Sequence, residues 1–126
     1  MINIKNCTRS RLPIKESTFC NIAEKILPKH YDLSLVFIGD QRSRNLNLKY
    51  RGKNYIPNVL SFPIDNLNGE VFINLNQLKK ETRKFESSYQ NLIILMFIHG
   101  CLHLSGLDHG KKMDKEEQKL RKKFLK

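Results

Sequence analysis

The sequence predicts an α+β or mixed α/β domain with a small β-sheet and a metal site at the end of a long central helix. Segments with the two-residue period of strands and segments with the helical period are interspersed along the 126 residues. No internal repeat or low-complexity linker divides the chain, and its length suits one hydrophobic core. We therefore expect residues 1–126 to form a single domain.

The N-terminal part of the chain predicts strand, helix, strand and helix in that order. Residues 1–6 are a short candidate strand. Between two prolines, residues 13–28 repeat apolar side chains at helical spacing, and residues 31–38 read as a largely buried strand. Asp40 is the expected N-cap of a short helix that ends near Gly52.

A hairpin and a basic helix follow. NVLSFP at 58–63 and GEVFIN at 69–74 resemble two short strands around the turn-rich DNLNG. Residues 76–85 have a helical pattern and carry a run of four basic residues. We interpret that run as a solvated helix face.

The most apolar stretch predicts the long central helix. Ser87 or Ser88 is the expected cap, and the helix ends at Gly106. The stretch is too short and too rich in histidine to cross a membrane, so we expect no membrane partner. Residues 113–126 predict a charged helix with Leu120 on its apolar face.

The chain is strongly basic. It has 23 Lys and Arg against 12 Asp and Glu, a formal net charge of +11. Such an excess attracts polyanions, which makes nucleic acid the natural partner class. A generally basic proteome is the alternative explanation.

The cysteines indicate a reducing compartment. Cys7, Cys20 and Cys101 are odd in number and form no CxxC pair, and the first residues lack the apolar core of an export signal. We expect a cytoplasmic protein in which Cys101 is a small core residue.

Three of the four histidines form the pattern H-x3-H-x2-G-x2-H. His99 and His103 lie one helical turn apart on the same face, and Gly106 allows the chain to turn so that His109 returns beneath them. Three imidazoles leave a fourth position on Zn²⁺ for water, which is the arrangement of catalytic zinc sites. The spacing is that of metzincin ligands and predicts a divalent metal.

Gly100 argues against peptidase chemistry. In HExxH peptidases the residue after the first ligand is a glutamate that serves as general base, and glycine has no side chain. Asp108 is the only carboxylate in the stretch. We expect it to orient an imidazole or cap the turn, with a role as base the weaker alternative.

HGCLHLSGLDH, residues 99–109, resembles the signature of the YbeY family of bacterial, metal-dependent endoribonucleases. LNLKYRGKNYIPNVLSFP, residues 46–63, and the following GEVFIN resemble the family's other marked segments in the same order. Leu107 stands where the family usually has tyrosine, and Pro57 and Asn58 replace the usual Thr-Asp. These replacements remove a hydroxyl and a carboxylate, and we expect Asn58 to hydrogen-bond and keep the loop.

The resemblance implies a zinc-dependent, single-strand-specific endoribonuclease with an α+β fold, in which helices flank a small mixed β-sheet. It assigns one Zn²⁺ ion to His99, His103 and His109, and importance for activity to Arg51. From its sequence context alone, Arg51 reads as a solvated residue after a helix. The implied partners are single-stranded RNA, ribosomal RNA and the small ribosomal subunit, in maturation of the small-subunit RNA 3′ end and in ribosome quality control. The chain is short for the family, so we expect fewer terminal RNA contacts.

Two alternatives follow from the same residues. One is a ribosome assembly factor with a mainly structural zinc ion, and the weaker one is a zinc peptidase whose base comes from elsewhere. Tyr50 and Tyr55 could stack on bases, but we expect them to pack in the core or at its rim.

Overall fold

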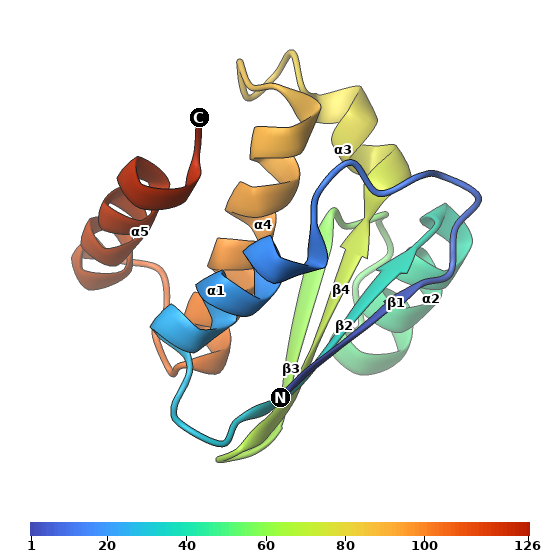
Figure 1. Cartoon of the computed structure of the whole chain (residues 1–126). Coiled ribbons are helices and arrows are strands. Elements are labelled where there is room, and N and C mark those ends of the chain that lie inside the picture. The colour runs from blue at the N-terminus through green and yellow to red at the C-terminus, as the bar shows by residue number, and fades with distance from the viewer.

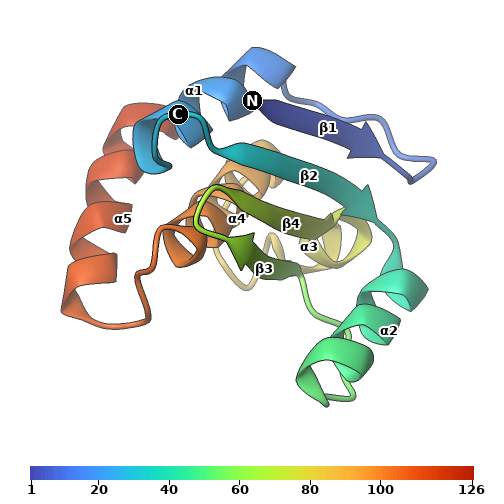
Figure 2. The same cartoon turned by 90° about the horizontal axis from the view of Figure 1, so that it is seen from below.

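The computed structural model describes residues 1–126 and contains a four-stranded mixed sheet with five helices. The strands are β1 (Ile2–Asn6), β2 (Asp32–Ile38), β3 (Val59–Asp65) and β4 (Asn68–Asn74). Their order is β1-β2-β4-β3, which Figure 2 shows directly. β2 pairs in parallel with β1 and β4, whereas β3 pairs antiparallel with β4 and forms one edge. The predicted α+β fold with a small mixed sheet is confirmed.

The helices cover the two faces of the sheet unequally (Figure 1). They are α1 (Glu16–Ile26), α2 (Asp40–Arg51), α3 (Leu75–Glu81), α4 (Tyr89–Leu104) and α5 (Lys111–Phe124). The main core of 23 buried residues joins α1, α4 and α5 to one face of the sheet. A smaller core on the other face includes Val36, Leu60 and Phe72 and packs against Leu46 of α2. No helix is both long and apolar enough to span a membrane.

The central helix α4 is almost entirely enclosed. It contacts β3, β4, α1, α3 and α5, and the ring of Phe97 meets that of Phe19 edge-on at 5.0 Å between centroids. Ser88 caps the helix as predicted, since its side chain accepts a hydrogen bond from the Asn91 backbone N–H. Cys101 is fully buried, as expected of a core residue. The rigid surroundings of α4 fix the position of the histidines at its C-terminal end.

The predicted capping role of Asp40 is wrong. Gly39 is the N-cap of α2, and no side chain caps this end. The Asp40 carboxylate instead accepts hydrogen bonds from Asn74 Nδ2 at 2.9 Å and Asn76 Nδ2 at 2.8 Å. Long-range amide donors therefore take the place of the helix's own N–H groups, and Asp40 ties α2 to the end of β4. The helix ends as expected at Gly52, whose φ of +65° is left-handed.

The buried face of α2 is polar. Ser43 and Asn47 are buried, whereas Leu48 is half exposed. Ser43 Oγ donates to the Pro57 carbonyl at 2.9 Å, and Asn47 Nδ2 donates to the Tyr55 carbonyl at 3.1 Å. These bonds satisfy backbone groups of the loop that leads into β3, and so they hold this loop against α2.

The other helix boundaries differ by a few residues from the prediction. α1 begins at Glu16 rather than near Pro13, α3 ends at Glu81, and α5 begins at Lys111. The four basic residues on and after α3 are exposed as predicted: Lys79, Lys80, Arg83 and Lys84. End residues carry the weakest periodic signal, so differences of this size are expected.

Candidate metal centre

Three histidines converge at the C-terminal end of α4. His99 and His103 lie one turn apart, with their Nε2 atoms 3.2 Å from each other. The ring of His109 lies 5.1 Å from that of His99 and 5.0 Å from that of His103, between centroids. One ligand atom from each residue lies within 4.8 Å of the other two. The predicted triple is therefore placed to bind a metal ion.

A Schellman turn brings His109 back to the helix. The Gly106 N–H donates to the His103 carbonyl at 3.0 Å and the Leu107 N–H donates to the Leu102 carbonyl at 3.1 Å, the two bonds that define this motif. Gly106 has a φ of +98°, which disfavours any residue with a Cβ. Leu107 packs against the main core, as an apolar residue at this position of the motif commonly does. Leu107 therefore stabilises the turn through its contact with the core.

The spacing of one pair of nitrogens is close to that of two ligands on a tetrahedral metal ion. With metal–nitrogen distances of about 2.0–2.1 Å, two ligands of tetrahedral zinc lie roughly 3.4 Å apart. The His99 and His103 Nε2 atoms lie 3.2 Å apart, and the exposed His109 brings its ligand atom within 4.8 Å of theirs. Imidazole donors suit zinc and other first-row transition metals.

The surroundings favour the neutral form of two of these imidazoles. Burial lowers the pKa of His99, with a further lowering from the neighbouring His103, while Glu117 opposes the shift. Burial also lowers the pKa of His103, with His109 adding to the effect and Asp108 opposing it. A neutral imidazole has the free lone pair that a metal ion requires.

The metal-free protein should lose stability as the pH falls below about 6.5, the usual pKa of histidine. Because His99 and His103 have lowered pKa values in the fold, the unfolded chain binds more protons below this pH, and the free energy of unfolding decreases. Thermal unfolding midpoints from about pH 7.5 to about pH 5.5 measure the effect. A His99→Gln variant should show a shallower decline than the wild type. Equal slopes in wild type and His99→Gln would contradict the assignment.

The three histidines open into a groove of about 510 Å³ beside the edge strand β3. Arg51 reaches this groove from the end of α2, so the structure brings together all four residues singled out from the sequence. The groove is lined by Arg51, Asn58, Val59, Leu60, Ser61, Pro63, His99, Gly100, His103, Asp108 and His109.

Arg51 is held in place by neighbours on α2 and the following loop. Its Nη1 donates to Asn47 Oδ1 at 3.3 Å and to the Tyr55 hydroxyl at 3.5 Å. Asn47 is fully buried and also bonds the loop backbone. The guanidinium is therefore anchored on one side and can present its remaining N–H groups to an anion in the groove.

The surroundings of Gly100 explain why no glutamate occupies this position. A Cβ built on Gly100 would lie 3.0 Å from both Ser61 Oγ and Val71 Cγ1. Ser61 Oγ also donates to the Gly100 carbonyl at 2.9 Å. Position 100 thus faces the sheet at close range, and a longer side chain has no room to serve as general base.

Gly100→Glu should destabilise the protein by roughly 3 kcal/mol or more, because it overpacks the helix–sheet contact and buries a carboxylate without a partner. Urea unfolding of the metal-free protein measures the change. Gln90→Glu introduces the same carboxylate at an exposed position of the same helix and should change stability by less than about 0.5 kcal/mol. Equal stability of the two variants would show that position 100 is roomier than the structure indicates.

The other residues singled out from the sequence lie around the histidines or at the edge of the domain. Asp108 lines the groove, and its charge acts on His103. Asn58 keeps the loop as expected: its Nδ2 donates to Glu81 Oε1 at 2.9 Å, and its carbonyl accepts from the Asn74 N–H. Tyr50 and Tyr55 are both at least 49% exposed, so they lie at the rim and not in the core.

Sequence reasoning missed Glu117. Its carboxylate Oε1 lies 3.7 Å from His99 Nδ1, and both side chains are largely buried. Within the charged run of α5, spacing relative to the buried Met113 and Leu120 is the one signal that could have identified it.

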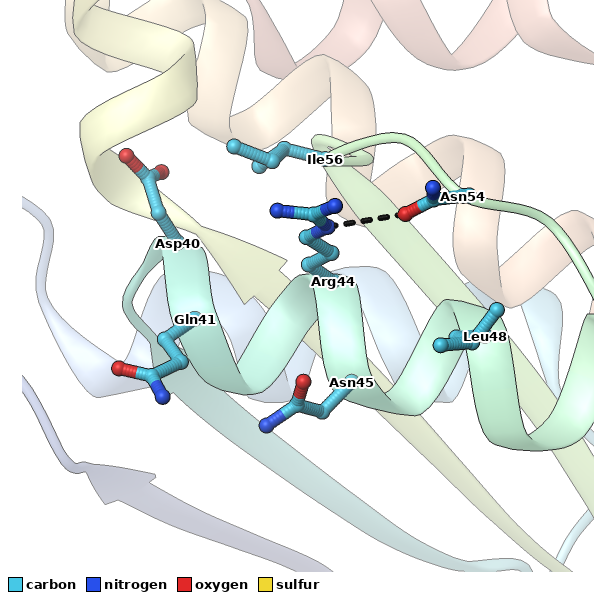
Figure 3. Close-up of a pocket in the computed structure, with 7 residues that line it drawn as sticks. All are labelled: Asp40, Gln41, Arg44, Asn45, Leu48, Asn54 and Ile56. Atoms are coloured by element: carbon cyan, nitrogen blue, oxygen red, sulfur yellow. Dashed lines mark hydrogen bonds between the residues drawn. The ribbon is translucent and has the colours of Figure 1, made fainter.

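A second groove, of about 590 Å³, lies along α2 (Figure 3). Arg44 crosses it and donates from Nε to Asn54 Oδ1 at 3.0 Å. Asp40 lies at one end, already bonded to two amides. This groove contains none of the metal-binding or catalytic residues predicted from the sequence, and we assign no chemistry to it.

Comparison of the sequence with known proteins gives matches that carry the same protein name. The family model described as "Endoribonuclease YbeY" matches residues 4–125. The chain is 34% identical over 127 residues to the endoribonuclease YbeY of Buchnera aphidicola subsp. Schizaphis graminum, covering 89% of this chain and 77% of that protein. It is 36% identical over 107 residues to the protein of the same name from Campylobacter jejuni strain RM1221, covering 78% of each.

A solved structure supports the fold. The solution structure of TM1509 from Thermotoga maritima is similar with a TM-score of 0.64, over 94% of this chain and 85% of that one. The two sequences are 22% identical, so this likeness concerns the fold alone.

Proposed function

The chain belongs to the endoribonuclease YbeY family, and on this basis we propose that it is a zinc-dependent endoribonuclease that cleaves single-stranded RNA. The observation that carries the proposal is the groove in which three histidine ligand atoms lie within 4.8 Å of one another beside an anchored arginine. A cation site together with a guanidinium suits a phosphodiester, which is negatively charged throughout its reaction.

The histidines, Arg51 and Asp108 have different roles in this mechanism. His99, His103 and His109 would hold the ion through neutral imidazoles. When bound, Zn²⁺ supplies Lewis acidity, which polarises phosphoryl oxygens and favours attack by water near neutral pH. Arg51 binds non-bridging phosphate oxygens and stabilises the charge that gathers on them. Asp108 is close enough to act on His103 electrostatically and helps to orient it.

The surface near the groove suits a flexible RNA strand. Tyr50 is 60% exposed, and its ring lies 5.5 Å from that of Phe62, between centroids. Lys49 Nζ lies 5.2 Å from the Tyr50 ring centroid. Exposed aromatic rings beside cations support sequence-tolerant binding of single strands, and the net charge of +11 supports attraction to RNA.

The cellular substrate follows from the family resemblance. We propose that the protein acts on ribosomal RNA, at the 3′ end of the small-subunit RNA, and in ribosome quality control. Its partners are then ribosomal RNA and the small ribosomal subunit, in the cytoplasm.

The alternative of a ribosome assembly factor with a structural zinc ion is less well supported. Structural zinc sites have four protein ligands. The candidate group here contains three residues, and it opens into a groove instead of being enclosed. The peptidase alternative still needs a base from another position, because residue 100 is packed against the sheet and cannot carry one.

Cleavage of matched single-stranded and double-stranded RNAs tests the proposal. The purified protein should cut the single strand at internal positions, stop when a chelator removes the metal, and resume when zinc is added. Normal ribosomal RNA processing in cells that carry only a metal-ligand variant would favour the assembly factor. Analysis of the product ends identifies the nucleophile, since a cyclic phosphate would mean that the 2′-OH attacks first.

A further inference from the structure

Glu117 lies on the buried face of α5, whereas most charged residues of this helix point to solvent. Met113 and Leu120 are buried against the main core, at 2% and 6% exposure. Glu117 lies four residues after the first and three before the second, so all three share one face of α5. Its side chain is only 20% exposed. The packing of α5 therefore directs this carboxylate inward.

The carboxylate faces the outer nitrogen of a metal ligand. His99 Nε2 lies 3.2 Å from His103 Nε2 and thus points into the centre of the three histidines. The other nitrogen, His99 Nδ1, lies 3.7 Å from Glu117 Oε1. This distance is within ion-pair range and slightly longer than a hydrogen bond.

We propose that Glu117 is a positioning residue of the metal centre, which accepts the Nδ1–H of His99 and so presents Nε2 as the ligand atom. A carboxylate in this position fixes the tautomer and the ring orientation of a metal-binding histidine, and it increases the basicity of the ligand nitrogen. The inference rests on the metal site of the proposed function but not on the nature of its substrate.

Neighbouring carboxylates do not duplicate this role. Glu116, the adjacent residue, is 42% exposed and forms an ion pair with Lys119 at 3.6 Å on the same helix. Asp114 is exposed in the first turn of α5. The charge of Asp108 opposes the lowering of the His103 pKa, whereas Glu117 is the carboxylate within ion-pair range of His99. Glu117 thus links the C-terminal helix to the first ligand.

The zinc dissociation constant, measured by competition with a chromophoric chelator, tests this role. Glu117→Ala should weaken zinc binding by roughly 10-fold to 100-fold, the usual effect of removing such a partner. Glu117→Gln should weaken it less, because the amide oxygen still accepts the hydrogen bond but the charge is lost. The control Glu116→Gln, on the same helix, should bind zinc as the wild type does.

Thermal unfolding of the metal-free variants separates positioning from a general packing role. Zinc affinity should fall in Glu117→Ala while the metal-free midpoint stays close to that of the wild type. Unchanged zinc affinity in both Glu117 variants would overturn the inference and leave the proposed function intact. Absence of zinc binding by the wild type would overturn the proposed function as well.

Discussion

His103→Ala should lose RNA cleavage and zinc binding together, with kcat lowered by about 1000-fold or more, since the Lewis acid contributes several kcal/mol to the barrier. His103 supplies one of three ligand atoms, and its Nε2 lies 3.2 Å from that of His99. Two remaining imidazoles hold zinc far more weakly than three. Cleavage assays on labelled single-stranded RNA, with zinc quantified in the same samples, measure both effects.

A matched histidine provides the control for this prediction. His30 lies in an exposed loop with a φ of 67°, a backbone conformation that asparagine also adopts readily. His30→Asn should retain wild-type cleavage and zinc content. Equal cleavage by His103→Ala and wild type would point to a contaminating nuclease and would favour the assembly-factor alternative.

Arg51→Ala should slow cleavage by about 100-fold to 1000-fold, the usual cost of removing one group that stabilises transition-state charge. Arg51 lines the groove but is not among the three metal-binding side chains, so zinc content should not change. Lysine keeps the charge without the planar fork, so Arg51→Lys should recover only part of the rate. Single-turnover cleavage with saturating enzyme separates this effect from weaker RNA binding.

Arg44 is the control for Arg51 because it lies on the same helix but lines the other groove. Arg44→Ala should reduce the net charge equally and change the cleavage rate by less than about 3-fold, through the weaker attraction of a polyanion. Loss of zinc from Arg51→Ala, or an unchanged rate, would remove Arg51 from its assigned role.

The sequence predicts those parts of the fold whose signals are local. The apolar run of α4, its serine cap and the glycine that follows it are all neighbours in the chain. The run and the glycine were predicted correctly, and Ser88 is one of the two caps that were expected. A small sheet followed from short strand-like runs between helices, whereas its mixed character was implied by the family resemblance. Strand order was not predicted, because the pairing of β2 with β4 joins segments that are far apart in the sequence.

Asp40 illustrates the limit of local reasoning about polar residues. Its position before a helical segment is typical of a cap, but two asparagines from another part of the chain bind its carboxylate. The buried polar face of α2 also depends on contacts with residues outside the helix. Asn47 is fully buried because it bonds the loop at Tyr55, a contact that no helical periodicity indicates.

The part of the candidate site that lies within one short segment of the chain could be predicted from the sequence. His99, His103 and His109 belong to a single helix end, so their convergence followed from helix geometry and Gly106. Arg51 required the family resemblance, since the sequence around it is that of a solvated residue. Glu117 approaches from a separate helix, and its contact with His99 depends on how α5 packs.

Titration of the metal-free protein with zinc tests the central claim most directly. The rate of single-stranded RNA cleavage should rise in proportion to added zinc and level off at about one ion per chain, as expected for one site with three protein ligands. His103→Ala should stay inactive throughout the same titration. Cleavage by the metal-free wild type at the full rate, or zinc-dependent cleavage by His103→Ala, would contradict the assignment of the nuclease activity to the three histidines.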